Sequence, residues 1–469
     1  MQFTQSIAHL FTTARDGRRL SVTRAPTAGH QLEPGASKAA GEAAIYVRGL
    51  LEAGAGERNL EDIAATVPGA DHQRVQHFMS NVAWDEAKVL DWVSARADGL
   101  LGGTPQSFLI ADESGFSKKG NSSSAVARQY NGRLGKVDNC QVGVFTALAA
   151  GSRVTLLEGR LYLPAAWADD AARCEKAKIP PEKQVYKSKA QIAREMIRAQ
   201  RQRGVRFAWT SLDAGYGKDP ALLRGLDADG ETFVADIHAP QRLWSEHPWP
   251  ALPLTTHSRA RGQPASRLRP AVPGQEVRAW AAARPAEEWI PFKRRDGIHG
   301  PLRGSFLHAR VWLWDGTEEE PRHWHLIVWR PGETPDKIKY VLSNAPADTP
   351  ALDLARMAAS RYWVERALQD AKSSAGMGEY QLRSWVGWHH HMALVMLAML
   401  FMLQQRLLLA EELPLLSTED IVWVLEHYLP RPHTSEAEIQ AALARRHRRR
   451  EADILSRKRR NPAILEDLL

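Results

Sequence analysis

Three acidic residues lie beside apolar segments, in positions that suit metal-dependent chemistry. They are Asp112 after the run 108–111, Asp213 after 207–212, and Glu365 within a helical pattern. Short apolar runs predict buried strands, and a carboxylate that leaves the end of such a strand points into a cleft. Clustered carboxylates can hold two divalent cations, which activate an attacking oxygen and stabilise a leaving one. The trio therefore suits the cutting of a phosphodiester bond.

Glu365 needs a separate argument because helices carry surface acids for ordinary reasons. Arg361, Glu365 and Lys372 fall within one broad face of the predicted helix. Val364 and Leu368 follow another, apolar face. The helix can thus pack by one stripe while its edge presents a carboxylate to a metal and cations to phosphate oxygens. An ordinary ion pair four residues apart explains the same spacing, and this helix alone favours that interpretation.

The bulk properties point to an intracellular protein with a polyanionic partner. The chain has 469 residues, a formal charge of +8 and a pI near 9.4, which favours nucleic acid as the partner. Cys140 and Cys174 show neither metal-ligand spacing nor a disulfide framework, which fits a reducing cytoplasm. The first residues lack a signal-peptide pattern. The longest apolar run, 392–403, is shorter than the roughly 18 residues that span a bilayer, so we expect a buried helix.

The elements that must position the acids follow from the periodicity of apolar residues. Before residue 104 the pattern predicts short helices, compatible with a helix-turn-helix-like DNA-binding unit and equally with a plain helical packing domain. From residue 107 the period changes to that of a β-meander followed by alternating helices and strands, which is a mixed α/β layer. The expected strands are 108–111, 142–149, 154–163, 207–212 and 232–237, and the expected helices are 189–203 and 220–226.

The second half of the chain reads as a β-rich segment between helices. Strands are expected at 306–314, 323–329 and 338–342, and long helices at 350–375 and 382–409. Arginine-rich runs at 445–450 and 457–460 form a basic tail, which would pair with phosphates on a DNA enzyme. We expect five segments. Residues 1–104 form a helical N-terminal DNA-binding domain, 105–238 the first part of a catalytic core and 239–340 a β-rich insertion. Residues 341–412 form the second part of the core with Glu365, and 413–469 a helical basic tail.

Several stretches together carry a resemblance to a known family. The ordered set spans about residues 40–410 and comprises Ala111–Phe116 with Lys118–Gly120, Arg128–Tyr130 with Gly132, Gly135–Lys136, Asn139–Val142, Tyr162–Pro164 with Trp167 and Asp170, Asp213–Gly217, Tyr362–Glu365 and Trp385–His389. With these residues the chain resembles the DDE-type insertion-sequence transposases. That resemblance implies an α/β fold with an RNase H-like catalytic core, interrupted by a mainly β insertion.

The resemblance also implies roles for single residues. Asp112, Asp213 and Glu365 would be the catalytic Asp-Asp-Glu metal ligands, binding two Mg²⁺ ions, with Mn²⁺ as a substitute. One branch of the family carries a Tyr-x2-Arg-x3-Glu-x6-Lys signature, whose last three positions match Arg361, Glu365 and Lys372. Its tyrosine position is Ala358 here, and the tyrosine is shifted to position 362.

The activity implied is that of a DNA transposase. Such an enzyme binds the terminal inverted repeats of its element, cuts the DNA by two-metal hydrolysis and joins the freed 3′-OH to target DNA. A homodimer on DNA is expected, in a bacterial cytoplasm and associated with the nucleoid when bound to DNA. Lys118 and Lys119 just past Asp112, together with Arg361 and Lys372, are the expected DNA contacts.

Two other classes of function stay open at this point. One is a domesticated DDE-fold DNA-binding protein or a nuclease without transposition activity, which has no need of all three acids. The other is a hydrolase with a carboxylate pair, such as a glycosidase, which predicts no DNA affinity.

Further polar residues have plainer interpretations. Glu113 should face away from Asp112 because neighbouring residues on a strand alternate sides. Asp170 and Asp236 are candidate auxiliary acids that read better as capping or surface residues, and His389–His391 diverge too far around a helix to chelate together.

Overall fold

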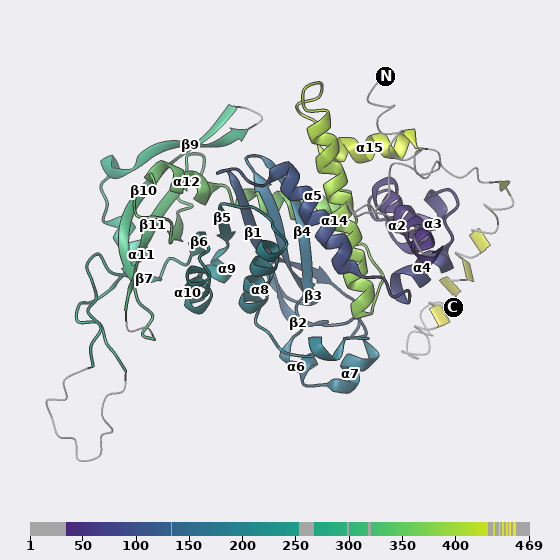
Figure 1. Cartoon of the computed structure of the whole chain (residues 1–469), viewed down its shortest axis with the longest axis horizontal. Coiled ribbons are helices and arrows are strands. Elements are labelled where there is room, and N and C mark those ends of the chain that lie inside the picture. The colour runs from purple at the N-terminus through teal and green to yellow at the C-terminus, as the bar shows by residue number, and fades with distance from the viewer. Residues whose placement is uncertain are drawn as a thin grey trace, which may run out of the picture.

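A large mixed sheet forms the centre of the protein, and helices cover both of its faces (Figure 1). The computed structural model describes residues 34–132, 134–252, 267–297, 300–317 and 320–429, with scattered residues between 435 and 455. The ten strands of the sheet are β1 Ser107–Ser117, β2 Ala127–Asn131, β3 Lys136–Ala150, β4 Arg153–Leu161, β5 Trp209–Leu212, β6 Phe233–Ile237, β9 Ile290–Gly297, β10 Gly300–Leu313, β11 Arg322–Pro331 and β12 Lys339–Ser343. A separate two-stranded ribbon consists of β7 Arg242–Leu243 and β8 Gln275–Glu276.

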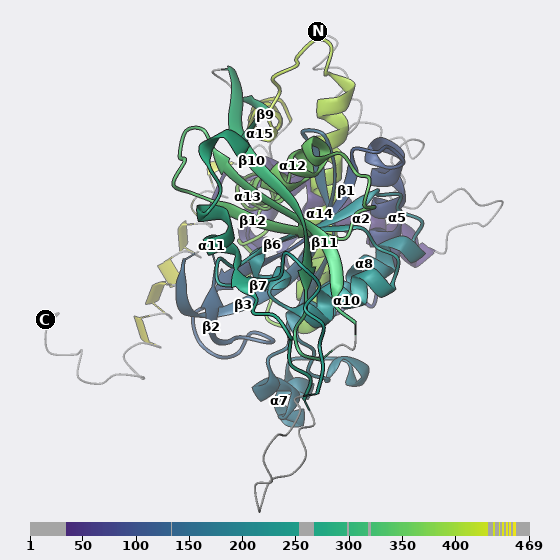
Figure 2. The same ribbon diagram turned by 90° about the vertical axis from the view of Figure 1, so that its left-hand side faces the viewer.

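The strand order is β2-β3-β1-β5-β6-β12-β11-β10-β9, with β4 also paired to β3. The central strands β1, β5 and β6 are parallel to one another, whereas β3 runs antiparallel to β1, β2 and β4. On the other side, β12 pairs antiparallel with β6 and continues into β11, β10 and β9. The strands of the expected β-rich insertion therefore extend the central sheet, as a wing that faces the viewer in Figure 2.

The first strand differs from the sequence expectation in its length. The apolar run ends before Asp112, but β1 continues to Ser117. Pairing between β1 and β5 ends at Ala111 and Leu212, while pairing with β3 continues to Ser117 and Cys140. Asp112 thus lies inside a strand, at the point where one of its two neighbours ends. The meander also has an additional strand, β2, which carries too few apolar residues to be recognised from its sequence.

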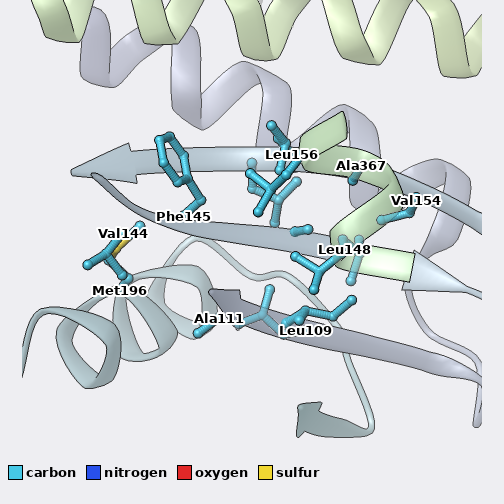
Figure 3. Close-up of a cluster of buried hydrophobic side chains, with 14 of the residues drawn as sticks. Leu109, Ala111, Val144, Phe145, Leu148, Val154, Leu156, Met196 and Ala367 are labelled. Atoms are coloured by element: carbon cyan, nitrogen blue, oxygen red, sulfur yellow. The ribbon is translucent and has the colours of Figure 1, made fainter. Parts of the chain in front are cut away.

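Two apolar layers hold the strands between helices (Figure 3). Leu109, Ala111, Val144 and Leu148 pack with Met196 of helix α8 (Lys189–Gln202), and all five are buried. The opposite layer includes Phe145, Val154, Leu156 and Ala367, the last from helix α13 (Tyr362–Ser374). Each fully buried aliphatic or aromatic side chain contributes about 1.5–3 kcal/mol, so these layers fix the strands that carry the acids.

The helix expected at 350–375 is two helices, α12 Ala351–Ala359 and α13 Tyr362–Ser374. At the break, the backbone N–H groups of Ser360 and Trp363 donate to carbonyls three residues earlier. The Ser360 hydroxyl also donates to the Arg356 carbonyl at 2.8 Å. Bonds of this i,i−3 type tighten the helix, and a serine that bonds back to the preceding turn bends it. The expectation of one continuous helix was therefore wrong, and Arg361 lies directly at the bend.

Helix α14 (Trp385–Leu408) is the most apolar helix of the described residues. Its length and composition would let it cross a membrane, but 78% of its most apolar 18-residue window is buried inside the protein. Its three histidines point in different directions: His391 bonds to the Tyr46 hydroxyl and His390 to the Met79 carbonyl, while His389 bonds within α14. Burial lowers the pKa of His389 to about 4 and that of His391 to about 3, so both are neutral at pH 7.

The remaining helices lie around this frame. The N-terminal group is α2 Pro34–Glu52, α3 Leu60–Thr66, α4 His72–Ser80 and α5 Glu86–Leu101, and three of these, α2, α4 and α5, pack against α14. The others are α6 Ala165–Ala168, α7 Ala171–Lys176, α9 Ala214–Gly217, α10 Pro220–Ala228, α11 Val277–Ala282 and α15 Thr418–Tyr428, with 3₁₀ turns at Pro181–Lys183 and Ala286–Glu288. Residues 1–33, part of the run 445–450 and all of 457–460 lie outside the described residues, so the structure does not describe those parts of the predicted N-terminal domain and basic tail.

Candidate active site

Four carboxylates come together at one edge of the parallel strands. Asp112 lies in β1, Asp213 directly follows β5, and Asp236 lies in β6. Because parallel strands present their carboxyl ends at the same edge of a sheet, residues just beyond the last paired positions become neighbours. Those last pairs are Ala111 with Leu212 and Leu212 with Ala235. The fourth acid, Glu365, approaches from the first turn of α13.

Asp213 is oriented by the short helix that it begins. Its Oδ1 accepts a hydrogen bond from the Tyr216 N–H at 3.0 Å, which makes Asp213 the N-cap of α9. Gly217 at the end of α9 lies directly against the next strand, where an added Cβ would be 1.9 Å from the Asp236 carbonyl oxygen. The cap and this close approach hold Asp213 beside β6.

Arg361 lies among the acids and contacts three of them. Its Nε is 3.1 Å from Asp236 Oδ2, its Nη1 is 3.6 Å from Asp112 Oδ2, and its Nη2 is 2.5 Å from Glu365 Oε1. The side chains of Arg361, Asp112 and Asp236 are largely buried, whereas that of Glu365 is 57% exposed. The ordinary ion pair foreseen between Arg361 and Glu365 is present, but it is one part of a larger network.

The electrostatics of the site show an excess of negative charge. Burial raises the pKa of Asp112 to about 7, with a further increase from the nearby Asp213, although Arg361 and the Glu113 N–H oppose it. Burial also raises the pKa of Asp236, against the effect of Arg361. Burial would lower the pKa of Arg361, but the surrounding carboxylates raise it above its usual range. Arg361, with Lys339 near Asp236, does not balance four acids, so the site favours additional cations.

Two of the other three predicted DNA-contacting cations lie beside a pair of aromatic rings. Lys118 Nζ is 3.5 Å from the centroid of Tyr380, and burial lowers its pKa to about 8. Lys372 Nζ is 5.6 Å from the centroid of Phe116, and that ring contacts Tyr380 edge to face. Lys119 is exposed. Two of the predicted cations therefore share an aromatic platform, which continues from Asp112 along β1.

Two acids that we interpreted as non-ligands are placed away from the site. Glu113 turns to the opposite face of β1 and pairs with Lys189 at 2.7 Å. Asp170 caps α7 by accepting a hydrogen bond from the Arg173 N–H. The interpretation of Asp236 as a surface or capping residue was wrong, because its buried side chain joins the site. Asp236 follows the apolar residues 233–235 within β6, and the rule that identified Asp213, applied to that shorter run, would have found it.

The donor set agrees with hard divalent cations in its chemistry. The side chains are all carboxylates, the ligands that Mg²⁺ and Mn²⁺ prefer. Within the described part of the chain, no group of three or more His, Cys, Asp or Glu side chains converges closely enough to share an ion as the structure stands. The guanidinium of Arg361 lies between the acids instead. The residues present therefore fit a cation site provided that Arg361 withdraws from part of it.

Comparison with known proteins identifies a family for this chain. The chain belongs to the DDE superfamily endonucleases, the family whose model matches residues 32–301, more than half of the sequence. It is also similar to the protein described as "Probable transposase for insertion sequence element IS701" from Microchaete diplosiphon. The two are 25% identical over 328 residues, which cover 69% of this chain and 72% of that protein.

These matches confirm the resemblance drawn from the sequence. The matched stretch includes some of the acids of the site and not others. Asp112, Asp213 and Asp236 lie inside the stretch that matches the family, whereas Glu365 and Arg361 lie beyond its end at residue 301. The mixed α/β architecture with one large sheet is consistent with a DDE nuclease fold. The roles of the individual acids do not follow from the match and rest on geometry.

Proposed function

We propose that this protein is an insertion-sequence transposase that cuts DNA at the ends of its element and joins the freed 3′-OH to target DNA. The observation that carries the proposal is the convergence of Asp112, Asp236 and Glu365 on one guanidinium, with Asp213 nearby, in a member of an endonuclease family. The similarity to the probable transposase of Microchaete diplosiphon supports the joining step as well as the cutting step.

Asp112, Asp213 and Glu365 would hold the metal, as two Mg²⁺ ions or, in substitution, Mn²⁺. When bound, the ions supply charge stabilisation to the attacking and leaving oxygens of an in-line displacement. Asp112 offers a rigid ligand because β1 is paired on both sides up to that position. Asp213 has its orientation fixed by the α9 cap. Glu365 is exposed and lies in the first turn of a helix that begins at a bend, so it is the ligand best able to adjust its position.

The chain's own cations would position the DNA. Lys118, Lys119 and Lys372 lie along or beside the continuation of β1 beyond Asp112, where they can contact successive phosphates. Lys118 lies six positions after Asp112, about 20 Å along an extended strand. No side chain needs to form a covalent bond to DNA, because water in the first step and the 3′-OH in the second serve as attacking groups.

The larger organisation belongs to the same proposal. The parallel strands β1, β5 and β6 beside the antiparallel β3 and β4 support an RNase H-like core. The wing β9–β12 corresponds to the β-rich insertion, and the helices before residue 104, the wing and the basic tail would bind element ends and phosphates. Because two ends must be joined, the active form would be a homodimer on DNA, acting in the bacterial cytoplasm.

The test is metal-dependent nicking and strand transfer on a duplex that carries the element's own end, with a scrambled duplex of equal length as control. We expect cleavage of the end duplex in Mg²⁺, joined products with target DNA, and neither product with Asp112→Ala or Glu365→Ala. Cleavage without joining would reduce the function to that of a nuclease. Binding without cleavage would identify a DNA-binding protein on this fold, and equal cleavage by the two variants would overturn the assignment of the acids.

A further inference from the structure

The guanidinium of Arg361 presents a separate edge to each of three carboxylates. Nε faces Asp236, Nη1 faces Asp112 and Nη2 faces Glu365. Two of these acids belong to the proposed metal site, whereas Asp236 does not. A guanidinium has five N–H donors in a fixed planar arrangement, so it can leave one partner and keep another without changing shape.

The three contacts differ in strength. The contact with Asp236 is 3.1 Å long, and both side chains are less than one-fifth exposed, so water screens it little. The contact with Asp112 is the longest, at 3.6 Å. The contact with Glu365 is short, but that carboxylate is 57% exposed, and exposed ion pairs contribute little. The bond to Asp236 is therefore the one best able to persist when the others are broken.

Divalent cations bound at the proposed site would compete with Arg361 for the same two acids. An ion held by Asp112, Asp213 and Glu365 neutralises the carboxylates that attract Nη1 and Nη2, and it repels the guanidinium. Asp236 lies one strand farther along the sheet, beyond Asp213, and offers a place for the displaced charge. The backbone of Arg361 does not need to move, since the bend between α12 and α13 already directs it to this point.

We propose that Asp236 is a positioning residue, which retains Arg361 through Nε when divalent cations displace Nη1 from Asp112 and Nη2 from Glu365. The two freed Nη groups then point at the cation-filled site, where they can donate to the phosphate oxygens of the DNA. Arg361 thus serves first as the internal counter-charge of the acids and afterwards as a phosphate contact. This inference rests on the proposed metal site and goes beyond it by assigning a task to Asp236.

The test is a double-mutant cycle on Mn²⁺ affinity, measured by isothermal titration of the full-length, DNA-free protein at pH 8. The four proteins are the parent, Asp236→Asn, Arg361→Gln and the double variant. Without the Asp236 charge, Arg361 turns wholly to Asp112 and Glu365 and competes with the ion. We expect Asp236→Asn to weaken Mn²⁺ binding about tenfold in the parent and less than about threefold in the Arg361→Gln background, a coupling typical of groups in contact.

Removing a negative charge near the ion weakens Mn²⁺ binding by the same factor in both backgrounds, so this effect cancels in the cycle. Equal losses in the two backgrounds would make Asp236 a direct ligand or a distant charge and would overturn the positioning role. Unchanged affinity in both would do the same. If the parent cleaves its end duplex, either result leaves the proposed function intact, whereas a parent that neither binds Mn²⁺ saturably nor cleaves DNA overturns both proposals.

Two controls separate positioning from folding. Asp236→Glu keeps the charge and should hold Mn²⁺ affinity within about threefold of the parent, which a purely steric role would not allow. Asp229→Asn removes a carboxylate that pairs with two arginines outside the site and should leave Mn²⁺ affinity unchanged. Thermal unfolding of each variant in EDTA shows whether the titrated protein is folded. If Asp236→Asn is unfolded, the Mn²⁺ affinity of Asp236→Glu decides whether Asp236 has the positioning role.

Discussion

Two groups of acids and arginines in this protein have opposite charge balances. Asp229, at the end of α10, accepts paired hydrogen bonds from both Arg194 and Arg198 of α8, so one carboxylate faces two guanidinium groups. At the site, four carboxylates surround the single guanidinium of Arg361. The arginines hold the pKa of Asp229 well below its usual range, whereas burial and the neighbouring Asp213 raise the pKa of Asp112 to about 7.

The difference separates a structural ion cluster from a site prepared for a ligand. Around Asp229 the carboxylate is fully paired with guanidinium groups, and the cluster fastens α10 to α8. Around Asp112 the fold retains uncompensated negative charge, which opposes folding but favours incoming cations. Strongly shifted pKa values gather where such charge serves chemistry. The two groups should therefore respond oppositely to neutralisation of an acid.

The largest expected effect is on cleavage. Asp112→Ala or Glu365→Ala should reduce Mg²⁺-dependent cutting of an end duplex by on the order of a thousandfold or more, since the loss of one preorganised electrostatic contact already costs about 10²–10³. Single-turnover gel assays measure it. The matched control is Glu113→Ala, which removes an adjacent acid that faces away and pairs with Lys189. A comparable loss in that variant would mean that the effect comes from disturbing β1.

The next effect is on stability without metal. The pKa of Asp112 is higher in the folded protein than in the unfolded chain, so ionisation opposes folding as pH rises from about 4 through 7. Asp112→Asn should therefore raise the free energy of unfolding in EDTA at pH 8 by about 2–4 kcal/mol. At pH 4.5 the gain should shrink severalfold. Urea unfolding at both pH values measures it, and a destabilised variant at pH 8 would refute the charge imbalance.

Asp229→Asn should change the free energy of unfolding in the opposite direction to Asp112→Asn and by a smaller amount. Its pKa is depressed in the folded protein, so its contribution to stability is present above the unfolded pKa and is lost as pH falls through the folded value. We expect a loss of about 1 kcal/mol at pH 7, because the pairs are partly exposed. The difference from the parent should persist at pH 4.5 and shrink only as the pH falls well below the unfolded pKa of about 4. A gain at pH 7 would contradict the interpretation of this cluster.

The smallest effect should come from Arg198→Gln. Asp229 keeps its bidentate contact with Arg194 and Arg198 is exposed, so the free energy of unfolding should change much less than in Asp229→Asn. DNA cleavage should not change. A loss as large as that of Asp229→Asn would show that the two arginines act as one unit.

The sequence was sufficient to place the acids on their elements, because apolar strands with a carboxylate at the end leave a local pattern. Asp112 and Asp213 could be singled out in this way, whereas Glu365 became a candidate only through the resemblance to the transposase family. The sequence could not show that β1 continues past Asp112, because β1 is prolonged by pairing with β3, whose residues lie far away in the chain. The bend at Ser360 was missed because a single back-bonding serine decides it.

The arrangement within the site was less predictable than its members. A spacing of four residues correctly indicated the pair of Arg361 with Glu365, but the contacts with Asp112 and Asp236 depend on tertiary packing. Asp236 was undervalued because its run is short and it was considered apart from Asp213. That β6 adjoins β5 is a property of the sheet, and only the sheet makes the two acids neighbours.

Gly217 has a consequence for how this protein can vary. Its backbone does not adopt the left-handed conformation, so flexibility does not explain why glycine stands there. Space does, since any Cβ at this position would collide with the main chain of Asp236. If position 217 is mutated to all residues and the variants are selected for transposition, we expect only glycine to survive. Even alanine should be excluded. Such a result would show that a steric contact, and no contact with substrate, restricts which residues can be inherited at position 217.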